Sequence, residues 1–228
     1  RMVPRQGLVV AKGSDAHLDQ VIGQGCWTPV ERFGVEPGAD LRWQAALSAG
    51  AGGSAFTVLH DGKPVGEVAW GLLGLHNVDN ALAAIAAARH AGVEPAVATA
   101  ALGEFRGVRR RMEVRGEVRG VTVYDDFAHH PTAIATTLDG LRRKVGAQRI
   151  IAVLEPRANT MKLGTHREAL TASLKGADRV WLYQGPDVKW DVRGLGTELG
   201  PRASVATSSA AWPRWTSGTT PGSDDPRS

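Results

Sequence analysis

The sequence predicts an α/β protein with two consecutive domains, and three features lead to this assignment. Short β-type runs separated by Gly, Pro and Asp occupy residues 7–67, and an Ala-rich segment follows from Asn77 to about His90. Strand-like and helix-like segments then alternate from residue 120 to residue 182. With 228 residues, 43% apolar and 22% charged, the chain is long enough for two domains that each bury a core.

The first domain is expected to be strand-rich and then helical. Residues 8–10 and 55–59 read as strands, and Asp61-Gly62 predicts a hairpin turn because both residues tolerate a positive φ. Ala, Leu and Ile at nearly every position of residues 77–90 predict a helix that is buried on most sides. A second helix is expected from Pro95 to about Glu104.

The second domain is expected to contain a parallel sheet. Residues 120–124, 149–154 and 179–182 read as strands, and residues 132–145 and 165–175 read as the helices between them. This βαβαβ order requires right-handed crossovers between parallel strands.

Composition sets the expected domain limits. We place the first domain at residues 1–112 and the second at residues 113–202. In residues 203–228 Ser, Thr, Ala, Gly, Pro and Asp dominate, and Leu, Ile, Phe and Met do not occur. Such a segment cannot bury enough apolar surface to fold, so we expect a disordered tail there.

Charge argues against a nucleic-acid partner. The net charge of +4 comes largely from one stretch of arginines: Arg106, Arg109, Arg110, Arg111, Arg115 and Arg119. Aromatic residues that stack on bases are not interleaved with them, and Glu113 and Glu117 interrupt the run. A solvated face or a contact with nucleotide phosphates is the better interpretation.

Hydropathy and the first residues argue against a membrane partner. No apolar run approaches the roughly 18 residues that a membrane span needs, and residues 1–6 lack the layout of a signal peptide. We therefore expect a cytoplasmic protein.

Two asparagines open the Ala-rich helix. Asn77 and Asn80 are three residues apart and share one helix face, and a carboxamide can both donate to and accept from an adenine edge. The pair therefore predicts an adenine contact. The alternative is that Asn77 or Asp79 caps the helix.

Acidic and imidazole side chains follow the first strand of the second domain. Asp125 and Asp126 stand at its carboxyl end, where open parallel sheets bind ligands, and an acidic group there can accept hydrogen bonds from ribose hydroxyls. His129 and His130 can contact phosphate or move a proton. Their adjacency and the lack of HxxxH or HExxH spacing argue against a metal site, so none is expected.

The domain junction carries Arg111. A guanidinium there can bridge a ribose or phosphate held by one domain to the other domain through charge-assisted hydrogen bonds. A surface arginine among six is the alternative. A phosphate-binding Gly-Lys-Ser/Thr loop does not occur in the 228 residues, since Gly62-Lys63 is followed by Pro64.

Four motifs in this order resemble the Mur ligase family over residues 7–193. They are HNxxN at 76–80, FxGxxRR at 105–111, YDDFAHHPT at 124–132, and LEPRANTMKLG at 154–164. The resemblance implies the later part of a central ATPase domain, followed by a Rossmann-like C-terminal domain. It also implies an ATP-dependent carboxylate-amine ligase that requires Mg²⁺.

The resemblance assigns roles to nine residues. Those implied to contact ATP are Asn77 and Asn80 at adenine, Arg111 at the ribose-phosphate region, and Asp126 at the ribose. His129 and His130 are implied to lie near the phosphates or the sugar nucleotide. Those implied to place the incoming peptide or substrate anions are Arg157, Asn159 and Lys162.

Within the family, the segment at 154–164 indicates the branch that joins L-Ala-γ-D-Glu-meso-diaminopimelate to UDP-N-acetylmuramate in peptidoglycan recycling. Rival interpretations are the L-alanine-adding branch, a folylpolyglutamate synthase relative and a non-catalytic nucleotide-binding remnant. The family's phosphate loop and its uridine-nucleotide domain are missing from these residues. We therefore expect the chain to be inactive alone.

Overall fold

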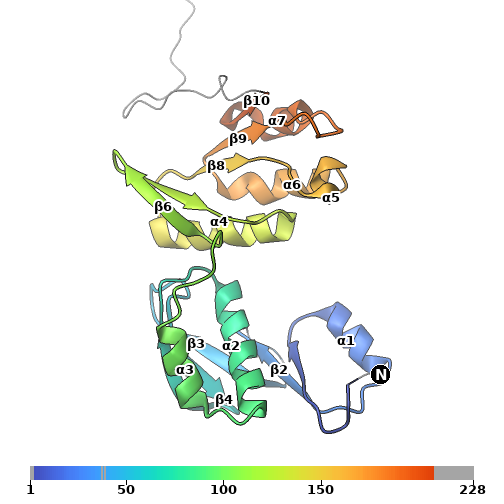
Figure 1. The fold of residues 1–228 in the computed structure, drawn as a ribbon, viewed down its shortest axis with the longest axis vertical. Helices are drawn as coiled ribbons and strands as arrows, with labels where there is room; N and C mark the ends of the chain where they lie inside the picture. Colours follow the sequence, from blue (N-terminus) through green and yellow to red (C-terminus); the bar gives the residue numbers. More distant parts are fainter. Residues whose placement is uncertain (1–2, 37, 39, 208–228) are drawn as a thin grey trace, which may run out of the picture.

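The computed structural model describes residues 3–36, 38 and 40–207, and it contains two lobes joined by one linker (Figure 1). The first lobe holds a five-stranded sheet in the order β1-β2-β3-β4-β5. Its strands are β1 (Val9–Lys12), β2 (Val30–Gly34), β3 (Leu41–Leu47), β4 (Ala55–His60) and β5 (Lys63–Ala69). The first three strands are parallel and the last three antiparallel, so only β1 to β3 have neighbouring carboxyl ends at one edge.

Helix α2 (Leu75–His90) supplies much of the core of this lobe. Its buried positions, Val78, Ala81, Leu82, Ile85 and Ala86, recur at the spacing of one helix face, and they pack with the fully buried Trp43 of β3. Helix α3 (Pro95–Gly103) begins with proline at its first turn and contacts β5 and α2.

The expected hairpin and both expected helices of the first lobe are present. Asp61 and Gly62 join β4 to β5 with φ values of 49° and 76°. The pattern did not indicate α1 (Ala16–Gly23), β2 or β3. Helix α1 has no buried residue, and with 8 residues it is too short for a helical period to stand out in the sequence.

The second lobe begins with a hairpin of β6 (Glu113–Val118) and β7 (Val121–Asp125). A parallel three-stranded sheet follows in the order β10-β9-β8, formed by β8 (Ile151–Leu154), β9 (Arg179–Tyr183) and β10 (Ala203–Ala206). The helical segments are α4 (Pro131–Val145), α5 (Asn159–Lys162), α6 (Arg167–Ser173), η1 (Leu174–Gly176), α7 (Arg193–Leu199) and η2 (Gly200–Arg202). They enclose a second, separate core.

Two expectations for this lobe are wrong. The strand at 120–124 exists as β7, but it pairs antiparallel with β6 and not with the parallel sheet. The disordered tail was expected to start at residue 203, yet Ala203–Ala206 form β10, because β9 offers them a parallel edge and Ala206 is buried there. The rest of the expected tail, residues 208–228, lies outside the described residues.

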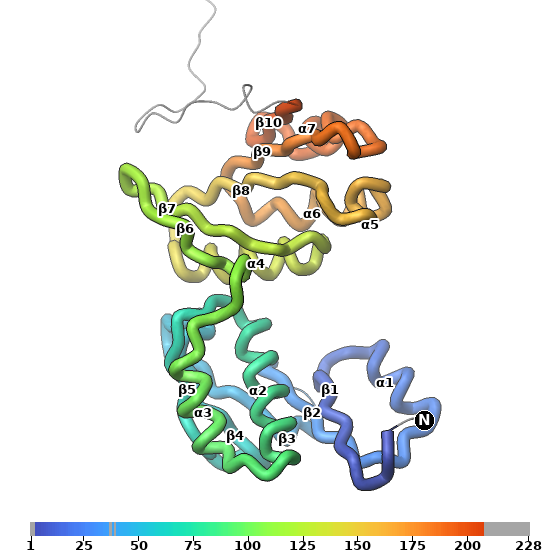
Figure 2. The backbone as a smooth tube through the Cα atoms, in the orientation of Figure 1, coloured from blue at the N-terminus to red at the C-terminus, as the bar shows by residue number. Residues whose placement is uncertain are grey.

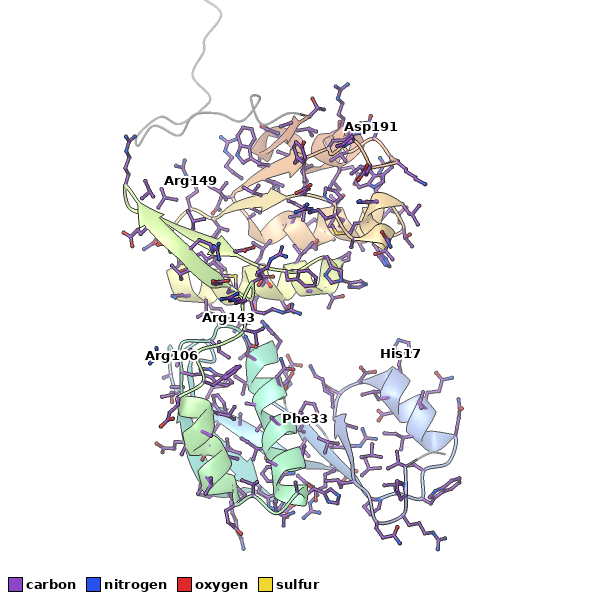
Figure 3. The ribbon with its side chains drawn as sticks, viewed as in Figure 1. His17, Phe33, Arg106, Arg143, Arg149 and Asp191 are labelled. Carbon is purple, nitrogen blue, oxygen red and sulfur yellow. The ribbon has the colours of Figure 1, made fainter. Side chains whose placement is uncertain are left out.

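The two lobes meet at small residues. A Cβ on Gly140 of α4 would lie 3.1 Å from the Cα of Gly74, just before α2, which is tighter than an ordinary van der Waals contact, so a larger residue would push the two segments apart. A Cβ on Gly52 would lie 3.6 Å from the Cβ of Arg143, and Figure 3 shows Arg143 between α4 and the first lobe. The tube in Figure 2 shows the linker running from α3 up to β6. No helix of the described residues is long and apolar enough to cross a bilayer.

Candidate functional site between the domains

The first turn of α2 carries both predicted asparagines. The Nδ2 of Asn77 donates to the carbonyl of Leu73 at 2.7 Å, which leaves its amide oxygen without a described partner. Asn80 is exposed, and no hydrogen bond to another described residue is made by its side-chain amide. Both amides therefore retain capacity for a ligand. The capping alternative is wrong, since the N-cap is Gly74 and no side chain caps this helix.

Asp79 fixes this turn to the ligand-binding edge of the sheet. Its Oδ1 accepts from the backbone N–H of Val35, after β2, at 3.1 Å, and its Oδ2 lies 2.8 Å from the Nζ of Lys12 at the end of β1. Because these partners follow the carboxyl ends of parallel strands, Asp79 holds the start of α2 at the edge where such sheets bind ligands.

Asp126 lies at the start of the loop after β7 and is largely engaged by backbone. Its Oδ2 accepts from the N–H of Met112 in the linker at 2.8 Å. Its Oδ1 accepts from the N–H of Ala128 at 2.8 Å and from the hydroxyl of Thr137 at 3.4 Å. The carboxylate predicted to contact ribose thus also organises the domain junction.

Arg111 lies beside this loop. Its guanidinium carbon is 5.7 Å from the ring centroid of Phe127, and that of Arg110 is 5.2 Å from the same ring. Arg110 is also loosely paired with Asp125 at 3.6 Å, whereas no ion pair is described for Arg111. Arg111 therefore keeps its charge free for an anion.

His76 connects the two halves of the site electrostatically. Burial lowers the pKa of His76 below 6.5, more than the nearby carboxylate of Asp126 raises it, and Arg111 lowers it further. The residue before Asn77 thus experiences Asp126 of the second domain and Arg111 of the junction. Gly74, at the start of α2, approaches Gly140 of α4, and Thr137 of α4 donates to Asp126, so the start of α2 and Asp126 lie near one region between the lobes. No sequence pattern marked His76 beyond its place in the HNxxN motif.

A cavity of about 800 Å³ opens beside this region, at the ends of β7, β8 and β9. Its lining combines both charge signs with aromatic surface, and comprises Arg110, Asp125, Asp126, Phe127, Ala128, His129, Val153, Leu154, Glu155, Arg157, Ala158 and Tyr183. Among the expected substrate contacts, Arg157 lines it, 3.5 Å from Glu155. Lys162 is instead paired with Asp187 at 3.2 Å, and neither it nor Asn159 lines the cavity.

The side chains of the adjacent residues His129 and His130 have different surroundings. The Nδ1 of His129 lies 3.0 Å from the carbonyl of Phe127, and His129 lines the cavity. His130 is the N-cap of α4: its Nδ1 accepts from the N–H of Thr132 at 3.3 Å, and its ring packs edge-on against that of His166. The described residues contain no cluster of three or more His, Cys, Asp or Glu that could hold a metal.

Phe127, Glu155 and Tyr183 were not predicted as site residues. Glu155 stands inside the LEPRANTMKLG motif, and Tyr183 follows the strand expected at 179–182, so its place at a carboxyl end was available as a signal. Nothing in the sequence indicated that the Phe127 ring would receive two arginines.

Comparison with known proteins identifies the class. The Mur ligase middle domain model matches residues 1–88, and the Mur ligase glutamate ligase domain model matches residues 110–212. The chain belongs to the Mur ligase family.

Within this family, the chain is similar to ligases that act on UDP-N-acetylmuramate, as their names state. Over 194 residues it is 53% identical to the UDP-N-acetylmuramate-L-alanyl-gamma-D-glutamyl-meso-2,6-diaminoheptandioate ligase of Escherichia coli, covering 84% of this chain and 41% of that protein. A murein peptide ligase from Psychrobacter arcticus superposes with a TM-score of 0.66 at 40% identity, covering 91% of this chain and 45% of that one. The UDP-N-acetylmuramate-L-alanine ligase of Acidothermus cellulolyticus is 35% identical over 180 residues, covering 78% of this chain and 37% of that protein. The chain thus spans about two fifths of the length of the curated relatives it matches.

Proposed function

We propose that this chain is part of an ATP-dependent ligase that joins L-Ala-γ-D-Glu-meso-diaminopimelate to UDP-N-acetylmuramate. The observation that carries the proposal is the 53% identity over 194 residues to a ligase named for this peptide. The open cavity with charges of both signs, next to the domain junction, is consistent with a peptide that carries ammonium and carboxylate groups.

In this proposal the nucleotide lies between the lobes. The exposed amide of Asn80 and the free amide oxygen of Asn77 read the adenine edge. Asp126 accepts hydrogen bonds from the ribose, and Arg111, which has no described ion pair, contacts the ribose-phosphate region.

The peptide occupies the cavity of the second domain. Arg157 binds a peptide carboxylate after exchanging its 3.5 Å contact with Glu155, which is long and largely exposed and therefore weak. His129 borders the same space. Asn159 and Lys162 remain weaker candidates, because they lie outside the lining and Lys162 is already paired with Asp187.

The chemistry explains the need for two domains. A carboxylate is a poor electrophile, so the muramoyl carboxyl takes the γ-phosphoryl group of ATP, and the peptide amine then displaces phosphate from the acyl phosphate. Catalysis of this kind depends on positioning and charge stabilisation, which closure of two domains around the substrates supplies. When bound, Mg²⁺ would neutralise charge on the nucleotide phosphates. Among the described residues, no group of three or more His, Cys, Asp or Glu could hold this ion by itself.

These 228 residues lack a Gly-Lys-Ser/Thr loop to hold the β- and γ-phosphates. We therefore expect no ATP-dependent phosphate release from this polypeptide alone, even with the muramate nucleotide and the tripeptide present. Robust turnover in a phosphate-release assay would overturn this expectation.

Peptide binding distinguishes the branches of the family. Isothermal titration calorimetry of the chain should detect binding of the tripeptide and no binding of L-alanine. Arg157→Ala should weaken the affinity for the tripeptide at least tenfold. Arg193→Ala is the matched control, since this exposed arginine lies outside the cavity lining. Preference for L-alanine would favour the L-alanine-adding branch.

Nucleotide binding tests the other half of the site. Asn80→Ala and Asp126→Ala should each weaken ATP binding, and both should leave the affinity for duplex DNA unchanged. Weak ATP binding is expected because the phosphate loop is missing. Tight, steeply salt-dependent DNA binding would instead favour the arginine cluster as a nucleic-acid site.

A further inference from the structure

Strand β8 has one open edge. It is the outer strand of the parallel sheet, in the order β10-β9-β8 (Figure 1), and its register pairs Ile151–Leu154 with Arg179–Leu182 of β9. The hairpin of β6 and β7 forms a separate sheet, so no strand of the described residues pairs with the other side of β8. An edge of this kind presents unpaired peptide groups and can accept a further strand.

The register identifies which peptide groups face this edge. The N–H of Arg179 donates to the carbonyl of Ile150 at 3.2 Å, so Ile150 turns its peptide groups towards β9. Successive residues of a strand turn their peptide groups to opposite sides, so Ala152 also faces β9, whereas Ile151 and Val153 face the open edge. Among the described residues, the N–H and the carbonyl of Val153 therefore have no backbone partner on that side.

Val153 carries this open edge into the cavity of the second domain. It lines the cavity, and it is 58% exposed. The same lining contains Arg110 of the linker and Asp125 at the end of β7, together with Glu155 and Arg157, which follow β8. A peptide donor and acceptor are thus flanked by charges of both signs. This combination suits a short peptide that has amides within it and charged groups along it.

We propose that the peptide bound in this cavity adds to β8 as a short extra strand. One of its amide carbonyls accepts from the N–H of Val153, and one of its amide N–H groups donates to the carbonyl of Val153. The inference rests on the proposed function, because L-Ala-γ-D-Glu-meso-diaminopimelate is the peptide expected there, and it has an amide on either side of its D-Glu residue.

Strand addition also explains discrimination against a free amino acid. L-alanine carries an ammonium and a carboxylate, which the charged lining can bind, but it has no amide to pair with Val153. Main-chain hydrogen bonds supply affinity when a peptide adds to a sheet edge, so a ligand without amides loses that part of the affinity.

Hydrogen exchange in the unmutated chain tests the proposal without any variant. In the absence of peptide, the Val153 amide should exchange with solvent deuterium at least tenfold faster than the Ala152 amide, because only the latter faces β9. Saturating tripeptide should slow the exchange of Val153 at least tenfold and that of Ala152 less than twofold. A Val153 amide that is already protected without the peptide would overturn the proposal.

Proline substitution tests the same N–H by affinity. Val153→Pro removes the donor and keeps an apolar side chain, and proline is tolerated on an edge strand where its nitrogen faces away from the ladder. In isothermal titration calorimetry this variant should bind the tripeptide at least tenfold more weakly than the unmutated chain. Ile151→Pro is the matched control: the Ile151 N–H faces the same open edge, but Ile151 does not line the cavity, so the affinity should stay within twofold. Equal affinities of the two proline variants would refute strand addition.

The two proposals fail in different ways. If the tripeptide binds the unmutated chain and leaves the Val153 amide unprotected, strand addition is refuted and the proposed function stands. If the tripeptide does not bind the unmutated chain, the proposed function fails, and strand addition by this peptide fails with it.

Discussion

The attachment of α2 to the sheet gives a graded prediction at Asp79. Asp79→Ala removes the acceptor of the Val35 N–H, which costs about 1–3 kcal/mol when that group is left unsatisfied. It also removes the ion pair with Lys12, whose side chain is 46% exposed, so that pair adds only about 0–1 kcal/mol. Asp79→Asn keeps an oxygen for Val35 and loses only the charge. We therefore expect the free energy of unfolding to fall by about 2–3 kcal/mol in Asp79→Ala and by about 0.5–1 kcal/mol in Asp79→Asn.

Equilibrium urea unfolding followed by far-ultraviolet circular dichroism, fitted with one transition per domain, measures both losses. Asp139→Asn is the matched control, because its pair with Arg143 is a surface contact of residues four apart on α4. It should change the free energy of unfolding by less than about 0.5 kcal/mol. Equal losses for the alanine and asparagine variants at Asp79, or losses below about 0.5 kcal/mol for both, would refute this account of how α2 is held.

Three further predictions follow. Burial lowers the pKa of His60 and of His76 below 6.5, so these two imidazoles bind protons more readily in the unfolded chain than in the folded one. The two neutral histidines therefore contribute their full stability above about pH 6.5, and this contribution is lost as the pH falls below that value. A urea midpoint that does not decrease between pH 7.5 and 5.5 would contradict this prediction. Leu182→Ala should destabilise the second domain by about 2–5 kcal/mol in thermal unfolding, because the Leu182 side chain is fully buried. Leu163 is 62% exposed, so Leu163→Ala should have little effect. Similar melting temperatures for the two variants would refute the assigned core. Gly140→Ala should shift the distance between spin-labelled domains, because its Cβ would meet the backbone of the first domain, and an unchanged distance would show that the lobes do not touch there.

The sequence predicted those elements that depend on neighbouring residues alone, and it failed for elements that depend on a distant strand. Asp61-Gly62 forms the expected turn because its chemistry is local. Helix α2 forms where the Ala-rich segment predicted a helix, but the expectation that it is buried on most sides is wrong, since its buried residues lie on one face. The strand at 120–124 was placed in the wrong sheet, because its β-type composition does not state whether β6 or β8 is its partner. β10 was missed because its Ala, Ser and Val residues become a strand only against the edge of β9.

The candidate site was predictable as a set of residue types but not as a set of contacts. Motif spacing indicated Asn80, Arg111 and Asp126, and the structure brings their segments to the domain junction. It could not indicate that Asp126 accepts from Met112, since this bond depends on how the linker returns over the loop after β7. Lys162 was grouped with Arg157 because the family resemblance assigns both residues of the LEPRANTMKLG motif to the substrate, yet Lys162 pairs with Asp187 outside the cavity.

The central claim is that one nucleotide contacts both domains. Titration of the isotope-labelled chain with ATP, followed by amide chemical shifts, tests it most directly. The account predicts simultaneous changes at the side-chain amide of Asn80 on α2 and at the backbone amides of Phe127 and Ala128, with one shared dissociation constant. Changes confined to one domain, or different constants for the two segments, would contradict it.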